Sequence, residues 1–152
     1  MKIVFLMAAL LIFGFLFLPG LNAEITINDD IFKTEIAFFP EEMEKGLSQR
    51  DSLEENQGML FVFLNPRRPV FWMKDMKFPL DVLWIRGETI VEISENIPLF
   101  TQGEITVLKP NQEIDKAMEI KAGSVSKYGI KTGDKLKIRY ELKADKQERR
   151  SD

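Results

Sequence analysis

Two short apolar runs do most to constrain the fold of this 152-residue chain. The first follows Gly58 and reads MLFVFLN, and the second follows Pro79 and reads LDVLWI. Successive side chains of a strand point to opposite sides, so a run that is apolar at neighbouring positions is typical of a strand covered on both faces. In the second run, Asp81 shares a face with Leu83 and Ile85. The two runs predict a β-sheet with a buried centre.

The rest of the chain adds strands and little helix. Turn residues at 66–69 and 86–88 separate alternating segments, which predicts a meander of about four strands over residues 58–94. Further strands are predicted at Glu24–Ile27, Phe32–Phe39, Glu104–Leu108, Lys116–Ile120 and Lys135–Leu142. Short helices are predicted at Pro40–Arg50, where Pro40 suits the first helical position, and at Ala122–Tyr128. The fold class is therefore α+β and mostly β: a compact single domain with an antiparallel meander or barrel-like sheet and one or two short helices.

The amino-terminal segment has the composition of a secretory signal. Lys2 precedes an apolar run that is broken only by Gly14, and Ala23 supplies a small residue for cleavage before Glu24. An uncleaved membrane anchor is the alternative, since Leu21 is larger than the residue usual at that position. We expect a signal peptide at 1–23, one β-rich domain at 24–142 outside the cytoplasm (secreted or periplasmic), and a disordered charged tail at 143–152.

Composition excludes several classes of function. The chain has no cysteine and no histidine, whereas cysteine proteases, Ser-His-Asp hydrolases and ordinary zinc sites each require a thiolate or an imidazole. The formal net charge is −3, without basic clustering, which argues against nucleic acid as a partner. Met73 and Met76 fit core packing better than a Cu(I) site. We expect no metal and no cofactor, and contact with the membrane only through an uncleaved amino-terminal segment.

Several segments occur in the order seen in a known family. They are Glu35–Ala37, Gly46–Arg50, Gly58–Phe63, Phe71–Lys74, Pro79–Ile85, Met118–Gly123 and Gly129–Asp134. In these segments the chain resembles the domain of unknown function 192 family, over about residues 31 to 140. The resemblance implies a compact, mostly β extracytoplasmic domain, and it implies no activity, because none is established for the family.

The predicted hairpin FWMKDMKFPLD, at residues 71–81, is the strongest candidate site, because its charged residues lie between two very apolar strands. A carboxylate at Asp81 needs a cation or several hydrogen-bond donors, and Lys74 or Arg50 could supply the cation. One hypothesis is a cleft for an anionic or sugar-like ligand, formed by Arg50, Lys74 and Asp81 with Trp72 as an aromatic platform. The other is a structural ion pair that joins the helix to the hairpin.

Three functions stay open from the sequence. The first is a non-enzymatic extracytoplasmic binding or accessory domain, whose partner is a small ligand or an envelope protein. The second is an envelope hydrolase that uses Asp81 or Asp75 as a general base. The third is a structural or protein-interaction module, favoured if a partner covers an apolar patch near Phe71 and Trp72. Of these functions, the sequence favours the non-enzymatic binding or accessory domain over an enzyme.

Overall fold

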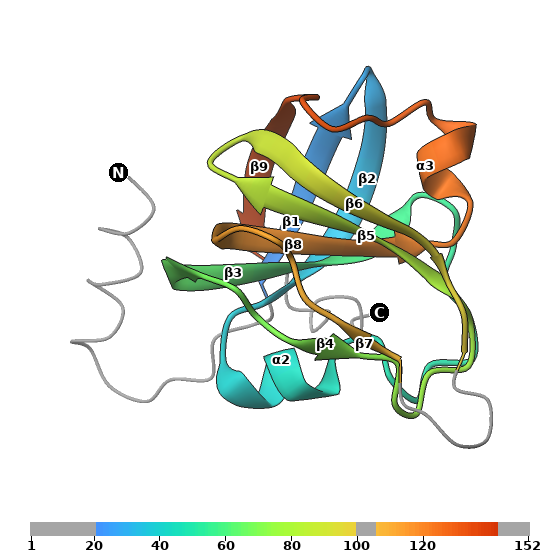
Figure 1. Cartoon of the computed structure of the whole chain (residues 1–152). Helices are drawn as coiled ribbons and strands as arrows, with labels where there is room; N and C mark the ends of the chain where they lie inside the picture. The colour runs from blue at the N-terminus through green and yellow to red at the C-terminus, as the bar shows by residue number, and fades with distance from the viewer. Residues whose placement is uncertain (1–20, 100–105, 143–152) are drawn as a thin grey trace, which may run out of the picture.

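The fold is a β-rich single domain, described here from a computed structural model that covers residues 21–99 and 106–142 (Figure 1). The strands are β1 (Leu21–Ile27), β2 (Asp30–Ala37), β3 (Gln57–Arg67), β4 (Phe71–Trp72), β5 (Leu80–Arg86), β6 (Thr89–Ile97), β7 (Val107–Leu108), β8 (Ile114–Lys121) and β9 (Leu136–Leu142). The helices are α2 (Pro40–Lys45) and α3 (Ser124–Lys127). The predicted class, mostly β with one or two short helices, is confirmed.

Seven strands form one sheet in the order β6-β5-β8-β3-β2-β1-β9, and β4 and β7 form a separate two-stranded sheet. The large sheet is mixed rather than purely antiparallel, because β2 and β3 run parallel. The predicted four-strand meander over residues 58–94 is wrong, because β8 lies between β3 and β5 and β4 pairs with β7. Parallel neighbours require a crossover connection, and residues 38–56, which include α2, provide it. The sheet curls so that its edge strands β6 and β9 approach each other at their starts, where one bridge pairs Thr89 with Lys135. The two strands do not pair along their lengths, so the sheet is not closed.

The central apolar runs are buried as predicted in β5 and over most of Met59–Phe63 in β3, whereas Leu64, at the end of the first run, is 75% exposed. Leu60 and Leu83 belong to a core cluster on one face of the large sheet, together with residues of β1, β2 and β9. Phe61 and Trp84 belong to a second cluster on the other face, together with residues near α2 and the β4–β7 pair. The second cluster, which includes Met59 and Met73 as packing residues, supports the candidate site described below.

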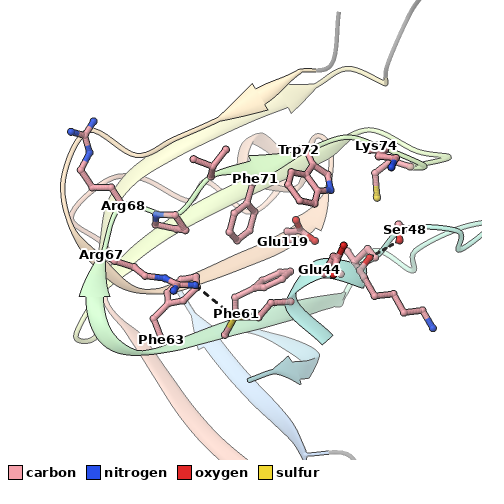
Figure 2. Close-up of a pocket in the computed structure, with 17 residues that line it drawn as sticks. Glu44, Ser48, Phe61, Phe63, Arg67, Arg68, Phe71, Trp72, Lys74 and Glu119 are labelled. Atoms are coloured by element: carbon pink, nitrogen blue, oxygen red, sulfur yellow. Dashed lines mark hydrogen bonds between the residues drawn. The ribbon is translucent and has the colours of Figure 1, made fainter. Parts of the chain in front are cut away.

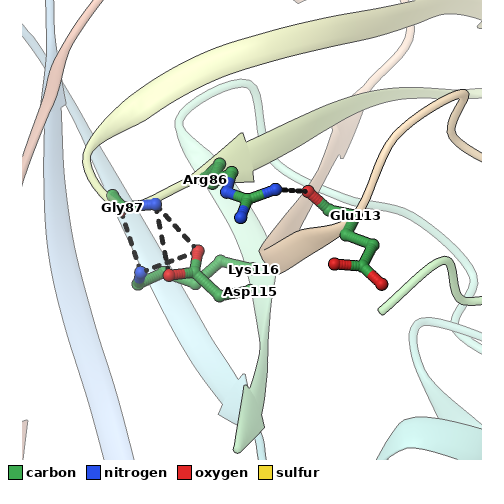
Figure 3. Close-up of polar contacts among 5 residues, drawn as sticks. All are labelled: Arg86, Gly87, Glu113, Asp115 and Lys116. Carbon is green, nitrogen blue, oxygen red and sulfur yellow. Dashed lines mark hydrogen bonds and ion pairs between the residues drawn. The ribbon is translucent and has the colours of Figure 1, made fainter. Parts of the chain in front are cut away.

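The turn between β5 and β6 is held by charged residues of β8 (Figure 3). The backbone N–H of Gly87 donates to both carboxylate oxygens of Asp115, at 3.0 and 3.1 Å. Lys116 donates from Nζ to the carbonyl of Gly87 at 2.9 Å, and Arg86 donates to the carbonyl of Glu113 at 3.2 Å. These contacts hold the β5–β6 hairpin against β8, so Asp115 and Lys116 have a structural role.

The expected domain, residues 24–142, has nearly the same limits as the strands, which begin with β1 at Leu21 and end with β9 at Leu142. Most of the predicted signal segment 1–23 and the predicted tail 143–152 lie outside the described residues. Leu21–Ala23, however, already belong to β1, where Ala23 is buried and pairs with Thr34 of β2 and Tyr140 of β9. Cleavage before Glu24 would therefore remove three paired residues. Within residues 21–99 and 106–142, no helix is long and apolar enough to cross a membrane.

Gly58 is required where β3 passes close to β8. A Cβ at this position would lie 2.5 Å from the carbonyl oxygen of Glu119 and 3.1 Å from Cγ2 of Ile120. Since the nearer atom is backbone, Gly58→Ala must separate two paired strands, and we expect a loss of about 2 kcal/mol in the free energy of unfolding, measured by urea denaturation. The control is Gly87→Ala, which has open space and carries only the strain of its positive φ, about 1 kcal/mol. Equal losses in the two variants would contradict the steric argument.

Candidate functional site

The four residues predicted from the sequence do not come together in one place. Trp72 and Lys74 line a groove beside α2. Arg50 instead forms a bidentate ion pair with Glu35 of β2, at 2.5 and 3.0 Å. Asp81 is fully buried within β5. The predicted hairpin at residues 71–81 is wrong, because β4 pairs with β7 whereas β5 pairs with β6 and β8. The connecting segment contributes to a pocket, but without the predicted grouping of Arg50, Lys74 and Asp81.

Asp81 is satisfied by backbone donors. Its Oδ1 accepts the N–H of Asn96 at 2.7 Å, and its Oδ2 accepts the N–H of Val125, in α3, at 2.9 Å. The prediction that this carboxylate needs a cation or several donors is thus met by donors, and the suggested ion pairs with Lys74 or Arg50 are wrong. Asp81 ties β5 to the end of β6 and to α3. Both of its oxygens are occupied, which leaves it poorly suited to act as a general base.

A groove of about 370 Å³ lies between α2, the end of β3 and the segment containing β4 (Figure 2). We call it the aromatic groove. Its lining residues are Met43, Glu44, Lys45, Gly46, Leu47, Ser48, Phe61, Phe63, Arg67, Arg68, Pro69, Val70, Phe71, Trp72, Lys74, Met76 and Glu119. The lining combines four aromatic residues with six charged ones, and a concave surface that offers both apolar contact and polar groups is typical of a site for a small molecule.

Glu119 of β8 is the buried polar group of this groove. It pairs with Met59 of β3 on one side and Val82 of β5 on the other, so its side chain is on the face of the second core cluster and opposite to that of Asp81. Only 8% of the residue is exposed. Among the residues that the structure describes, its Oε2 has no hydrogen-bond partner. A buried carboxyl oxygen without a partner is costly, and such groups concentrate where a ligand binds or chemistry occurs.

The environment of Glu119 favours its neutral form. Burial raises the pKa of its carboxyl to about 8, and the positive charge of Arg50 opposes this rise. Arg50 is itself held by Glu35, whose hydrogen bond is the main cause of the raised pKa of the guanidinium. At neutral pH the free groove therefore carries a mostly protonated carboxyl group.

Gly46 keeps the space beside this carboxyl group open. The predicted helix at 40–50 ends at Lys45, and Gly46 follows with a φ of +49°, a conformation that favours glycine. A Cβ on Gly46 would lie 3.4 Å from Cζ of Phe61 and 3.7 Å from Oε2 of Glu119. The glycine thus both ends α2 and leaves room for a ligand next to Oε2.

Aromatic rings form the walls of the groove. The rings of Phe61 and Phe71 lie 4.8 Å apart at an angle of 59°, and Phe71 also contacts the buried Trp84 at 5.2 Å. These contacts fix the two phenylalanines from behind. Trp72 is 48% exposed at the mouth of the groove. Two rings are therefore rigid, and a third is open to a ligand.

The charged residues of the groove are unevenly placed (Figure 2). Arg67 and Arg68 lie at one end, where the guanidinium of Arg67 covers the ring of Phe63 at 4.5 Å and Nε of Arg68 donates to the carbonyl of Pro110 at 2.8 Å. Glu119 and Glu44 lie toward the other end, near Trp72. Within the described residues, no group of three or more Asp and Glu side chains is arranged to hold a metal ion.

Comparisons with known proteins place the chain in a family. Residues 23–138 match DUF192, described as Uncharacterized ACR. The chain belongs to the DUF192 family. The resemblance seen in the sequence motifs is therefore confirmed, and no curated protein matches the chain.

Two solved structures are similar to this DUF192 domain. One is a protein of Sinorhizobium meliloti 1021, provisionally described as a transcription regulator, with 27% identity and a TM-score of 0.70 over 82% of this chain and 97% of its own. The other is a protein of unknown function from Novosphingobium aromaticivorans DSM 12444, with 28% identity and a TM-score of 0.68 over 76% of this chain and 83% of its own. Both support the fold, and neither supplies an established activity.

The sequence reasoning missed Glu119. The signal was present, because a charged residue between Met118 and Ile120 interrupts a predicted strand in which Ala117 is also apolar. Alternation along that strand places Glu119 on the same face as Ala117, which is fully buried. A carboxylate at a position that alternation predicts to be buried identifies a candidate site in this DUF192 domain.

Proposed function

We propose that this DUF192 domain is an extracytoplasmic binding domain whose ligand is a small organic molecule bound in the aromatic groove over Glu119. The observation that supports it is the Oε2 of Glu119, which is buried at the inner wall of the groove and has no hydrogen-bond partner among the described residues. A ligand group that reaches Oε2 would satisfy the carboxyl. Trp72 and Lys74, predicted from the sequence as ligand-binding residues, contribute the mouth of the same groove.

The location outside the cytoplasm is supported by the composition of residues 1–23, an apolar run behind Lys2. The description of the Sinorhizobium protein as a transcription regulator is not carried over to this chain. A formal net charge of −3 without basic clustering does not favour DNA binding.

A hydrolase is the second candidate, with a different residue from those first considered. The neutral carboxyl of Glu119, whose pKa is raised to about 8, could serve as a general acid, and Glu44 adds a second carboxyl to the same groove. Asp75, exposed beside α2, does not line the groove itself but an adjoining depression that shares Trp72 and Lys74 with it. An interaction module is the third candidate, supported by the exposed Val70, Trp72 and Val107.

Thermal denaturation in the presence of a panel of sugars, organic anions and organic cations tests the binding function. We expect at least one compound to stabilise the wild-type chain, by about 2.7 kcal/mol at 100 times its Kd, and to lose most of this effect in Glu119→Gln and in Trp72→Ala. Phe39→Ala is the matched control for Trp72→Ala, since Phe39 is a similarly exposed aromatic residue that does not line the groove. A panel in which every compound acts equally on parent and groove variants would rule out the proposal.

A further inference from the structure

We infer that the ligand of the aromatic groove is a small organic cation, with an alkylammonium group placed against Phe61, Phe71 and Trp72 and with the carboxylate of Glu119 as its counter-ion. This inference rests on the proposed binding function and names the chemical class of the ligand. It follows from the groups that line the inner part of the groove.

The first argument is the missing partner of Glu119. A buried carboxylate is stabilised by a cation or by several hydrogen-bond donors. Asp81 on the opposite face has two backbone donors, whereas Oε2 of Glu119 has none among the described residues. The cation that acts electrostatically on Glu119 is Arg50, and both of its terminal nitrogens already bond to Glu35. A bound cation would supply the positively charged partner that Oε2 of Glu119 lacks among the described residues.

The second argument is the arrangement of the rings. The face of an aromatic ring attracts a cation, and tryptophan does so best. Phe61 and Phe71 are inclined to each other by 59° rather than stacked, and Trp72 adds an exposed indole beside them. Rings set at an angle around a carboxylate are the usual surroundings of a methylated or alkylated ammonium group.

The third argument concerns the other charges of the groove. Glu44 adds a negative charge near Glu119, while Lys45, next to Glu44 in α2, and Lys74, next to Trp72, add two positive charges to the lining. Arg67 and Arg68 lie at the far end and already contact Phe63 and the carbonyl of Pro110. Those two arginines are placed to bind the acid group of a zwitterion. A simple cation and a zwitterion would bind through the same ammonium group, and the experiment distinguishes them by comparing choline with glycine betaine.

A cation and the proton compete for Glu119. In the free groove burial holds the pKa of Glu119 near 8, and a bound ammonium would favour the ionised form. The other charged groups that line the groove or act on Glu119 are Arg50, Glu44, Lys45, Arg67, Arg68 and Lys74. A range from pH 6 to pH 9 spans the pKa of Glu119 in the free groove, which is about 8.

The experiment is isothermal titration of the full chain with choline at pH 6, 7.5 and 9. Choline keeps its charge throughout this range, so any change of affinity comes from the protein. We expect binding to tighten with rising pH by up to roughly 100-fold, which is the increase in the ionised fraction of a group with a pKa of 8. We also expect release of most of one proton per choline at pH 7.5, seen as a dependence of the heat on the buffer.

Matched probes and variants make the outcome decisive. The neutral isostere 3,3-dimethyl-1-butanol should bind at least about 10-fold more weakly than choline at pH 9, and glycine betaine tests whether an acid group adds affinity. Glu119→Gln should abolish the pH dependence, while Trp72→Phe should retain more affinity than Trp72→Ala. The melting temperature of each variant without ligand confirms that it is folded.

Three results would overturn the inference: equal binding of choline and its neutral isostere, affinity that is constant or falls with rising pH, or no binding of choline, betaine, tetramethylammonium or methylammonium. If one of these occurs while a neutral or anionic compound binds in a manner that depends on Glu119 and Trp72, the proposed binding function stands and only the cation is wrong. If no compound of any class binds, both fail.

Discussion

Glu119→Gln is expected to remove a pH dependence of stability that the wild-type chain shows between pH 5 and pH 9. The carboxyl has an ordinary pKa of 4.5 in the unfolded chain and about 8 in the fold. A raised pKa in the fold favours folding fully below pH 4.5, and this contribution is lost as pH rises toward 8, because the unfolded chain releases the proton first. We expect the wild type to lose on the order of 4 kcal/mol relative to Glu119→Gln over this range, measured by urea denaturation at pH 5, 7 and 9.

Glu44→Gln is the matched control for this measurement. Glu44 lines the same groove but is exposed, so its replacement by the amide should leave the pH dependence of the wild type unchanged. Parallel curves for the wild type and Glu119→Gln would show that Glu119 is not held neutral by burial. They would also remove the basis for a ligand that depends on its ionisation.

Asp81→Ala is expected to lower the free energy of unfolding by roughly 3 kcal/mol. The substitution leaves the N–H groups of Asn96 and Val125 without their acceptors, and the second of these lies in a buried environment. It also frees the start of α3 from β5. Urea denaturation at pH 7 measures the loss, and hydrogen exchange should show faster exchange at the amides of Asn96 and Val125.

Two asparagine variants complete this test. Asp81→Asn keeps one acceptor and places an NH₂ group opposite a backbone N–H, so its loss should fall between those of wild type and Asp81→Ala. Asp75→Asn makes the same chemical change at an exposed position and should alter stability by less than about 0.5 kcal/mol. A neutral effect of Asp81→Ala would mean that Asp81 is not the anchor of α3. In that case a catalytic role for Asp81 would regain interest.

Local patterns were sufficient for the elements of the fold. The apolar runs in β3 and β5 predicted the buried centre of the sheet, because a strand alternates its side chains between two faces and both faces were apolar. Pro40 predicted the start of α2 correctly, whereas the predicted helix ran on to Arg50 through Gly46, where α2 ends. The parallel pairing of β2 with β3 could not be predicted in this way, since a crossover and a hairpin use similar strands and differ only in the path of the connection.

The candidate site shows the same division. The sequence by itself determined that Asp81 would need partners and that Trp72 and Lys74 would lie beside apolar strands, since burial depends on the pattern of neighbouring residues. Only the tertiary structure decided which partners were available. Asp81 accepts hydrogen bonds from two backbone N–H groups, and Arg50 pairs with Glu35. Glu119, distant from Trp72 and Lys74 in the sequence, lies beside aromatic rings of β3 and β4, and its Oε2 has no donor among the described residues. A hydrogen bond or its absence depends on segments that are brought together across the sheet, and no short stretch of sequence contains that information.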